Sequence, residues 1–176
     1  MVTQKVNFHQ FFLIMIKLIT TLKEKDISIP PYKDEFKIKS PNFLYGEKIP
    51  KKYTPYGKDI HPSFYWYNFP KETKSFAIVC EDPDTPSGKI FTHWIVKNIP
   101  GTVTKIEEGE IIGEEIVNSW GFSRYSGPKP PNGEHRYFFR IYAFKREQLY
   151  SKSMAGIKKE IEMKKIDEAV IMGTFG

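Results

Sequence analysis

The spacing of hydrophobic positions divides the chain into two regions. Between residues 8 and 22, large apolar side chains recur at the three- and four-residue intervals of one helix face. Pro30 and Pro31 then interrupt this pattern, because proline cannot continue a helix. From Phe36 onward, the apolar residues fall in short runs that are typical of strands. The pattern predicts an amphipathic helix with a proline linker over residues 1–35 and a β-rich domain over residues 36–176.

The second region contains several strand-like segments and a single long helical one. Strands are expected at residues 36–40, 63–67, 74–80, 91–99, 137–144 and 169–174, and a helix is expected over residues 145–166. Short strands, long connections and a late helix are typical of a β-sandwich with appended helices. The sequence therefore predicts a mainly β fold.

The apolar face of the N-terminal segment needs a partner. Its large side chains are Phe8, Phe11, Phe12, Met15, Ile19 and Leu22. Burying each of them is worth roughly 1.5–3 kcal/mol, so the face would not stay in water. The run is too short to span a bilayer and carries Lys17 in its middle. Three alternatives stay open: docking on the domain, a homodimer through residues 8–22, and contact with a membrane surface.

Composition narrows the function classes. The net charge is +6, but only four of the 27 basic residues are arginines, and the lysines are spread along the chain. Arginine supplies most bidentate recognition of bases and phosphates, so we expect no nucleic-acid partner. The single cysteine, Cys80, cannot form an internal disulfide, which favours a reducing, cytoplasmic location. Its apolar surroundings indicate a buried, inert thiol.

Three loop or strand segments concentrate the polar chemistry. Residues 81–88 follow a buried strand, and two prolines stiffen the loop that holds Asp82. Residues 91–96 carry His93 and Trp94, which strict strand alternation would place on opposite faces. Residues 127–137 form a Pro/Gly loop that delivers His135 at the start of a strand. Composition alone favours a structural turn over a functional site for each of the three segments.

Taken together, these segments resemble the phosphatidylethanolamine-binding protein family. The motifs are Asp-Pro-Asp-Thr-Pro at 82–86, Thr-His-Trp-Ile-Val at 92–96 and Gly-Pro-Lys-Pro-Pro-Asn-Gly-Glu-His-Arg-Tyr at 127–137. Residues 46–53, 73–77 and 96–100 are similar to the bacterial and archaeal branch. The resemblance implies a Greek-key β-sandwich with small peripheral helices. It also implies a surface pocket that binds phosphate or phosphoryl groups.

The resemblance assigns this pocket to particular residues. Asp82, His93 and His135 would form it, and Trp94, Pro131 and Tyr137 fall beside the same motifs. Two imidazoles can donate hydrogen bonds to an anion without a permanent charge. A carboxylate beside an anion is unfavourable unless it accepts a ring N–H, so that it sets the tautomer and favours the charged imidazole.

The next residue along, Arg136, should point to the other face of its strand and form an ion pair with Asp82 or Asp84. The chain ends at Gly176, directly after the last expected strand. Animal members carry a further C-terminal helix beside the pocket, so we expect a more open pocket here.

The implied function is that of an anion-binding regulatory protein and not an enzyme, with no cofactor and no bound metal. Because the family includes inhibitors of serine proteases and of kinase signalling, a serine protease or another protein is an alternative partner. Residues 51–63 and 123–132 would then be the contact segments. The alternative function is a metal- or His/Asp-dependent hydrolytic enzyme, because two histidines and a carboxylate match a facial metal triad.

Overall fold

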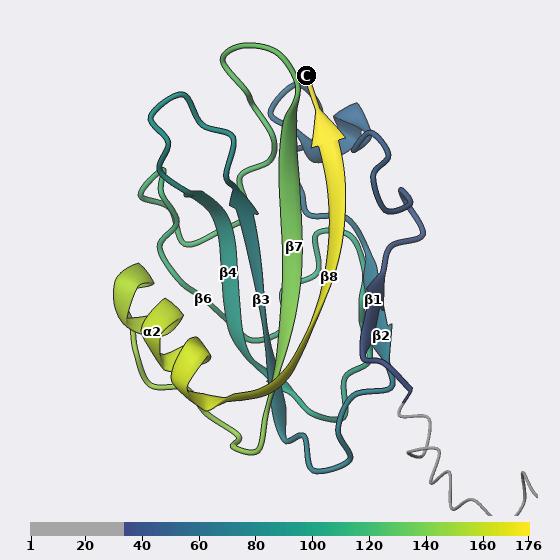
Figure 1. Ribbon diagram of the computed structural model, residues 1–176, viewed down its shortest axis with the longest axis vertical. Coiled ribbons are helices and arrows are strands. Elements are labelled where there is room, and N and C mark those ends of the chain that lie inside the picture. The colour runs from purple at the N-terminus through teal and green to yellow at the C-terminus, as the bar shows by residue number, and fades with distance from the viewer. Residues whose placement is uncertain (1–33) are drawn as a thin grey trace, which may run out of the picture. The chain divides into compact units, whose positions relative to one another are not determined.

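The computed structural model describes residues 34–176. They fold into two antiparallel β-sheets that pack face to face (Figure 1). The three-stranded sheet has the order β1 (Lys37–Lys39), β2 (Phe64–Tyr67), β5 (Lys105–Ile106). The five-stranded sheet has the order β6 (Glu114–Glu115), β4 (Phe91–Pro100), β3 (Ser75–Asp82), β7 (His135–Phe144), β8 (Lys165–Phe175). The predicted N-terminal helix, its linker and the dimer surface at residues 8–22 lie outside the described residues.

The core lies between the two sheets because every second side chain of a strand points to the same face. Ile38 and Trp66 of the small sheet and Phe76 and Ile141 of the large sheet are buried in one cluster. Each large apolar side chain removed from water in this way contributes roughly 1.5–3 kcal/mol. The predicted class, a mainly β Greek-key sandwich with peripheral helices, is confirmed for the described residues.

One helix covers part of the outer face of the five-stranded sheet. It is α2 (Met154–Lys164), and its buried Ile157 and Ile161 pack with Val79 and Ile95 of the sheet (Figure 1). The side chain of Ser153 caps the first turn by accepting a hydrogen bond from the backbone N–H of Gly156. A short 3₁₀ helix, η1 (Lys51–Tyr53), lies in the connection between β1 and β2.

The predicted helix over residues 145–166 was wrong at both ends. Residues 145–153 form a loop, because the buried ammonium of Lys97 donates to the carbonyls of Leu149 and Ser151 at 2.8 and 3.0 Å. At the other end, β8 begins at Lys165, where pairing with β7 replaces helical hydrogen bonds. The expected strands are present with shifted ends, whereas the two-residue strands β5 and β6 were not predicted. Such short pairings are decided by partners distant in sequence, not by local pattern.

Candidate functional site

A cavity of about 250 Å³ lies at the end of the five-stranded sheet where β3 finishes and where β4 and β7 begin. In Figure 1 this is the upper end, at which the C-terminus also lies. Antiparallel pairing brings these termini together, since Asp82 pairs with Phe91 and Glu81 pairs with Phe138. The cavity is lined by Asp82, Thr85, Pro86, Phe91, His93, Trp120, Lys129, Pro131 and His135.

Asp82 and His135 form a buried pair at the base of the cavity. The ring Nδ1 of His135 lies 2.8 Å from Oδ2 of Asp82, and both side chains are at most 6% exposed. The other carboxylate oxygen accepts the backbone N–H of Asp84 at 2.7 Å. Because an ionised carboxylate only accepts, the His135 proton must sit on Nδ1. Nε2 is therefore the ring nitrogen that His135 can offer to a ligand.

His93 reaches the cavity through an irregularity in its strand. The pairing of β3 with β4 passes from Cys80–Trp94 directly to Glu81–Thr92, so His93 is an extra residue on β4. Such a bulge re-aims the side chains that follow it. The ring of His93 meets the ring of Tyr137 edge-on at 5.2 Å, on the side that faces the other sheet. Trp94 also faces that side, so the expectation of opposite faces for His93 and Trp94 was wrong.

The protonation of His93 is set by its surroundings. Its Nδ1 lies 2.6 Å from the carbonyl oxygen of Ser126, which can only accept, so Nδ1 carries the proton. Burial lowers the pKa of His93 below its usual value because the charged imidazole is desolvated, although the Ser126 carbonyl and Asp82 oppose this shift. At neutral pH, the free ring therefore presents an Nε2 lone pair that can take up a proton.

The wall of the cavity is mostly apolar. Phe91 and Trp120 meet edge-on with 5.1 Å between ring centroids, and the prolines at 86 and 131 complete this part of the lining. Among the lining residues, Lys129 is the one basic side chain outside the histidines, and it is exposed. Five lining residues were not predicted as site residues: Thr85, Pro86, Phe91, Trp120 and Lys129. An aromatic residue in a polar turn is a signal that could have indicated Trp120.

Two predicted site residues do not line the cavity. Trp94 donates its Nε1–H to Glu115 at 2.7 Å and stacks on His61 with ring centroids 4.5 Å apart. Tyr137 lies behind His93 and is fully buried, and burial raises its pKa. The nearby carboxylate of Asp82 raises this pKa further. Asp82, His93, Pro131 and His135 are thus brought together, while Trp94 and Tyr137 support them from the core.

Comparison with known proteins gives this geometry a family. A family model described as phosphatidylethanolamine-binding protein matches residues 39–176. The chain belongs to the phosphatidylethanolamine-binding protein family. A UPF0098 protein of Chlamydia pneumoniae is 38% identical over 151 residues, which cover 77% of this chain and 95% of that protein.

Solved structures of the phosphatidylethanolamine-binding protein family agree with the fold. The crystal structure of a phosphatidylethanolamine-binding protein homolog from Chlamydia trachomatis has a TM-score of 0.76 at 32% identity and covers 81% of this chain and 97% of its own. The structure of Escherichia coli YbcL, described as a member of the mammalian family, also has a TM-score of 0.76, at 28% identity over 81% of this chain and 98% of its own.

The family motif also carries an ion pair at the edge of the cavity. Nε and Nη2 of Arg136 donate to the two carboxylate oxygens of Asp84 at 2.9 and 2.7 Å, and the Arg136 backbone N–H donates to the same carboxylate. This guanidinium lowers the pKa of Asp84 to about 2. The predicted ion pair is therefore present, with Asp84 as the partner. It ties the loop after β3 to the start of β7.

Other predicted chemistry can be placed within residues 34–176. Cys80 is buried, and burial raises the pKa of its thiol, which keeps it unreactive. No group of three His, Cys, Asp or Glu side chains in this range is placed to hold a metal ion. In the same range, no helix combines the length and the apolar character needed to cross a membrane.

Proposed function

We propose that this protein binds a phosphate or phosphoryl group in the cavity at Asp82, His93 and His135 and acts as a regulatory binding module. The observation that carries the proposal is the way the two imidazoles are held. Each Nδ1 is engaged by a protein oxygen, Ser126 O for His93 and Asp82 Oδ2 for His135. Both rings line a single small, mostly apolar cavity, and Nε2 is the nitrogen that each would offer to a ligand there.

The charges of the site favour an anion that is itself protonated or whose binding protonates His93. Asp82 would repel an anion, but the hydrogen bond that it accepts from Nδ1 of His135 partly offsets its charge. Burial keeps His93 neutral without ligand, whereas a bound anion would stabilise its charged form. Lys129 adds positive potential at the mouth. Binding should therefore take up a proton and tighten as the pH falls toward the His93 pKa.

A phosphate titration followed by ¹⁵N NMR of the histidine rings tests the proposal. We expect the Nε2 signals of His93 and His135 to move with millimolar phosphate, and the movement to be larger at lower pH. His61 is the internal control, because it is buried but its ring nitrogens contact the carbonyls of Pro62 and Glu110 outside the cavity. If neither cavity histidine responds, or if His61 responds equally, the proposed site is wrong.

A second candidate function is inhibition of a serine protease, for which one observation speaks. The two expected contact segments, 51–63 and 123–132, brace each other. The Tyr125 hydroxyl donates to the carbonyl of Tyr53 at 3.0 Å, and the backbone N–H of Gly127 donates to Asp59 at 2.8 Å. Preorganised loops lose little entropy on binding, as a protease inhibitor requires. A lack of inhibition across a panel of chymotrypsin-like and elastase-like enzymes at micromolar protein would eliminate this candidate.

A further inference from the structure

The loop that connects β6 to β7 is organised by one buried side chain, Asn118. Its Oδ1 accepts the backbone N–H groups of Trp120 and Phe122 at 2.9 and 3.1 Å. Its Nδ2 lies within 3.1 Å of three oxygens: the carbonyls of His93 and Arg124 and the hydroxyl of Ser126. The side chain is 3% exposed. One amide thus ties both halves of the loop to the strand that carries His93.

These contacts close a cycle around the cavity histidine. The backbone carbonyl of His93 accepts from Asn118 Nδ2 and from the backbone N–H of Ser126 at 3.1 Å. The carbonyl of Ser126 in turn accepts the ring proton of His93 at 2.6 Å. Because Asn118 also reaches the Ser126 hydroxyl, it holds the residue whose carbonyl sets the His93 tautomer.

We propose that Asn118 is the positioning residue of the cavity, which keeps the His93 proton on Nδ1 and places Trp120 in the wall. Asn118 would not touch the ligand; it acts through Ser126 and through the turn that carries Trp120. The effect on the His93 tautomer does not depend on any ligand. The effect on phosphate affinity rests on the proposed function.

The arrangement requires an amide. Two N–H donors face Oδ1 and three oxygen acceptors face Nδ2, and this fixes the orientation of the side chain. An aspartate of the same shape could accept from Trp120 and Phe122, but it would repel the carbonyls of His93 and Arg124. A serine is too short to serve both sets of partners. Asn118→Asp therefore keeps the volume and removes only the donors.

The test is ¹⁵N NMR of the His93 ring in phosphate-free protein, at a pH well above the ordinary histidine pKa. The parent protein should show a protonated Nδ1 and an unprotonated Nε2. In Asn118→Asp, we expect the two signals to shift toward each other as the Nε2–H tautomer becomes populated. We also expect phosphate affinity to fall about tenfold, the lower end of the scale known for losing a group that orients a metal-ligating histidine.

Asn98→Asp is the matched control. Asn98 also braces a loop, because its Oδ1 accepts the backbone N–H of Leu149 at 2.8 Å and its Nδ2 lies 3.3 Å from the carbonyl of Leu149. It lies at the other end of β4, away from the cavity. This variant should lower the melting temperature but leave the His93 tautomer and the phosphate affinity unchanged.

A parental tautomer in folded Asn118→Asp would overturn the proposal, whatever its effect on stability. If that variant does not fold, Ser126→Ala takes its place. It removes the contact of Asn118 with the Ser126 hydroxyl, so that the Ser126 carbonyl is held less firmly, and we expect a smaller shift in the same direction. No change of the His93 signals in Ser126→Ala would equally overturn the proposal. A changed tautomer without any phosphate binding by the parent would instead remove the proposed function and keep the role of Asn118.

Discussion

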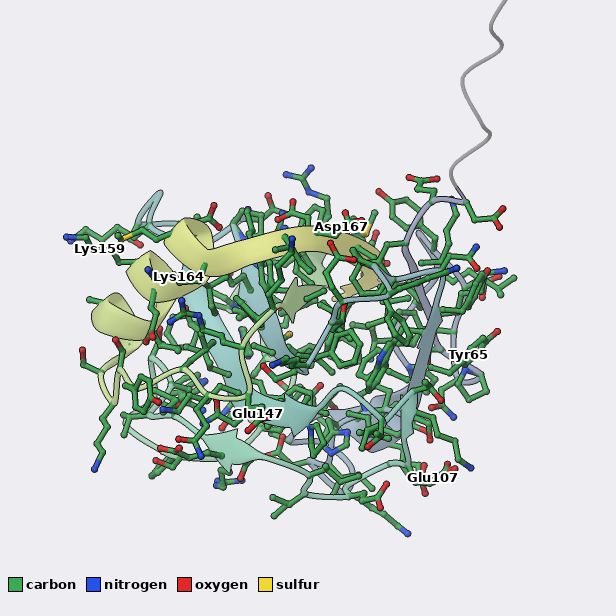
Figure 2. All side chains as sticks on the ribbon, turned by 90° about the horizontal axis from the view of Figure 1, so that it is seen from below. Tyr65, Glu107, Glu147, Lys159, Lys164 and Asp167 are labelled. Carbon is green, nitrogen blue, oxygen red and sulfur yellow. The ribbon has the colours of Figure 1, made fainter. Side chains whose placement is uncertain are left out.

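The two ends of the five-stranded sheet each carry a cavity, and they differ in what lies beneath them. At one end, about 250 Å³ lie above the buried Asp82, His93 and His135. At the other end, about 530 Å³ are lined by residues 73–74, 98, 100–102 and 147–148. Figure 2 looks onto this second end, with Glu147 labelled in the loop that precedes α2.

The larger cavity has the weaker claim to be a site. The buried cation beside it, Lys97, is held by the carbonyls of Leu149 and Ser151 and lies 3.3 Å from Glu114. It closes a loop and has no ammonium proton to spare. At the smaller cavity, two imidazoles line the wall, and each is held by the protein through its Nδ1. The state of the buried polar atoms therefore distinguishes a binding site from a structural brace better than volume does.

The strongest effect on stability is expected at the larger cavity. Lys97→Met keeps the apolar stem but leaves the carbonyls of Leu149 and Ser151 without their donor, so the free energy of unfolding should fall by about 3 kcal/mol. Phosphate affinity should stay within about twofold of the parent value, since Lys97 does not line the smaller cavity. Urea unfolding and the phosphate titration measure the two quantities. A large loss of affinity in folded Lys97→Met would break the distinction between the two ends.

At the smaller cavity, the main effect should be on binding. His93→Gln removes a ring nitrogen that can become a charged donor, and we expect phosphate affinity to fall by about tenfold or more, the scale of a hydrogen bond to a charged group. His61→Gln is the control, because this equally buried histidine stacks on Trp94 outside the cavity. It should lower stability and spare binding. Equal losses of affinity in both variants would contradict the assignment.

The pH dependence of stability gives a third, smaller signal. Burial lowers the pKa of His93 from the usual 6.5, so the unfolded chain binds this proton more tightly than the folded one does. The contribution of His93 to stability is thus complete above the unfolded pKa and decreases as the pH falls below it, by at most about 1.4 kcal/mol per pH unit for one proton. When the free energy of unfolding, measured with urea, is plotted against pH, the slope should be shallower for His93→Gln and for the parent protein with phosphate than for the parent alone. The same slope for the parent protein, for His93→Gln and for the parent with phosphate would show that His93 is not the group whose protonation changes stability.

The smallest effect is expected at the edge of the binding cavity. Arg136→Lys breaks the bidentate contact with Asp84. The Arg136 side chain is 54% exposed, so the free energy of unfolding should fall by only about 0.5 kcal/mol. The backbone N–H of Arg136 still donates to Asp84, which should keep the loop in place and leave phosphate affinity within about twofold. Melting curves and titration measure both. A strong loss of binding would make Arg136 part of the site instead of its edge.

Local patterns in the sequence predicted the class of fold, and the resemblance of three motifs to a known family predicted the centre of the candidate site. Alternating and apolar runs mark which face of a strand is buried, and they predicted the strands that build the sandwich. The motif at 82–86 and the loop before His135 stand at strand ends, where stiff prolines hold polar groups. It was the resemblance of these motifs to the phosphatidylethanolamine-binding protein family that named Asp82, His93, His135 and Pro131, and all four line the cavity.

Tertiary structure alone decided how these residues meet. The extra residue at His93 comes from the register of β4 against β3, and no local pattern in β4 encodes it. Asn118 contacts a carbonyl 25 residues away, and Lys97, 52 residues from Leu149, holds the first part of the predicted helix as a loop. Trp94 has the motif position of a site residue but packs on His61 in the core. Register, loop bracing and side-chain direction depend on contacts between distant segments, and these exist only once the sheets have packed.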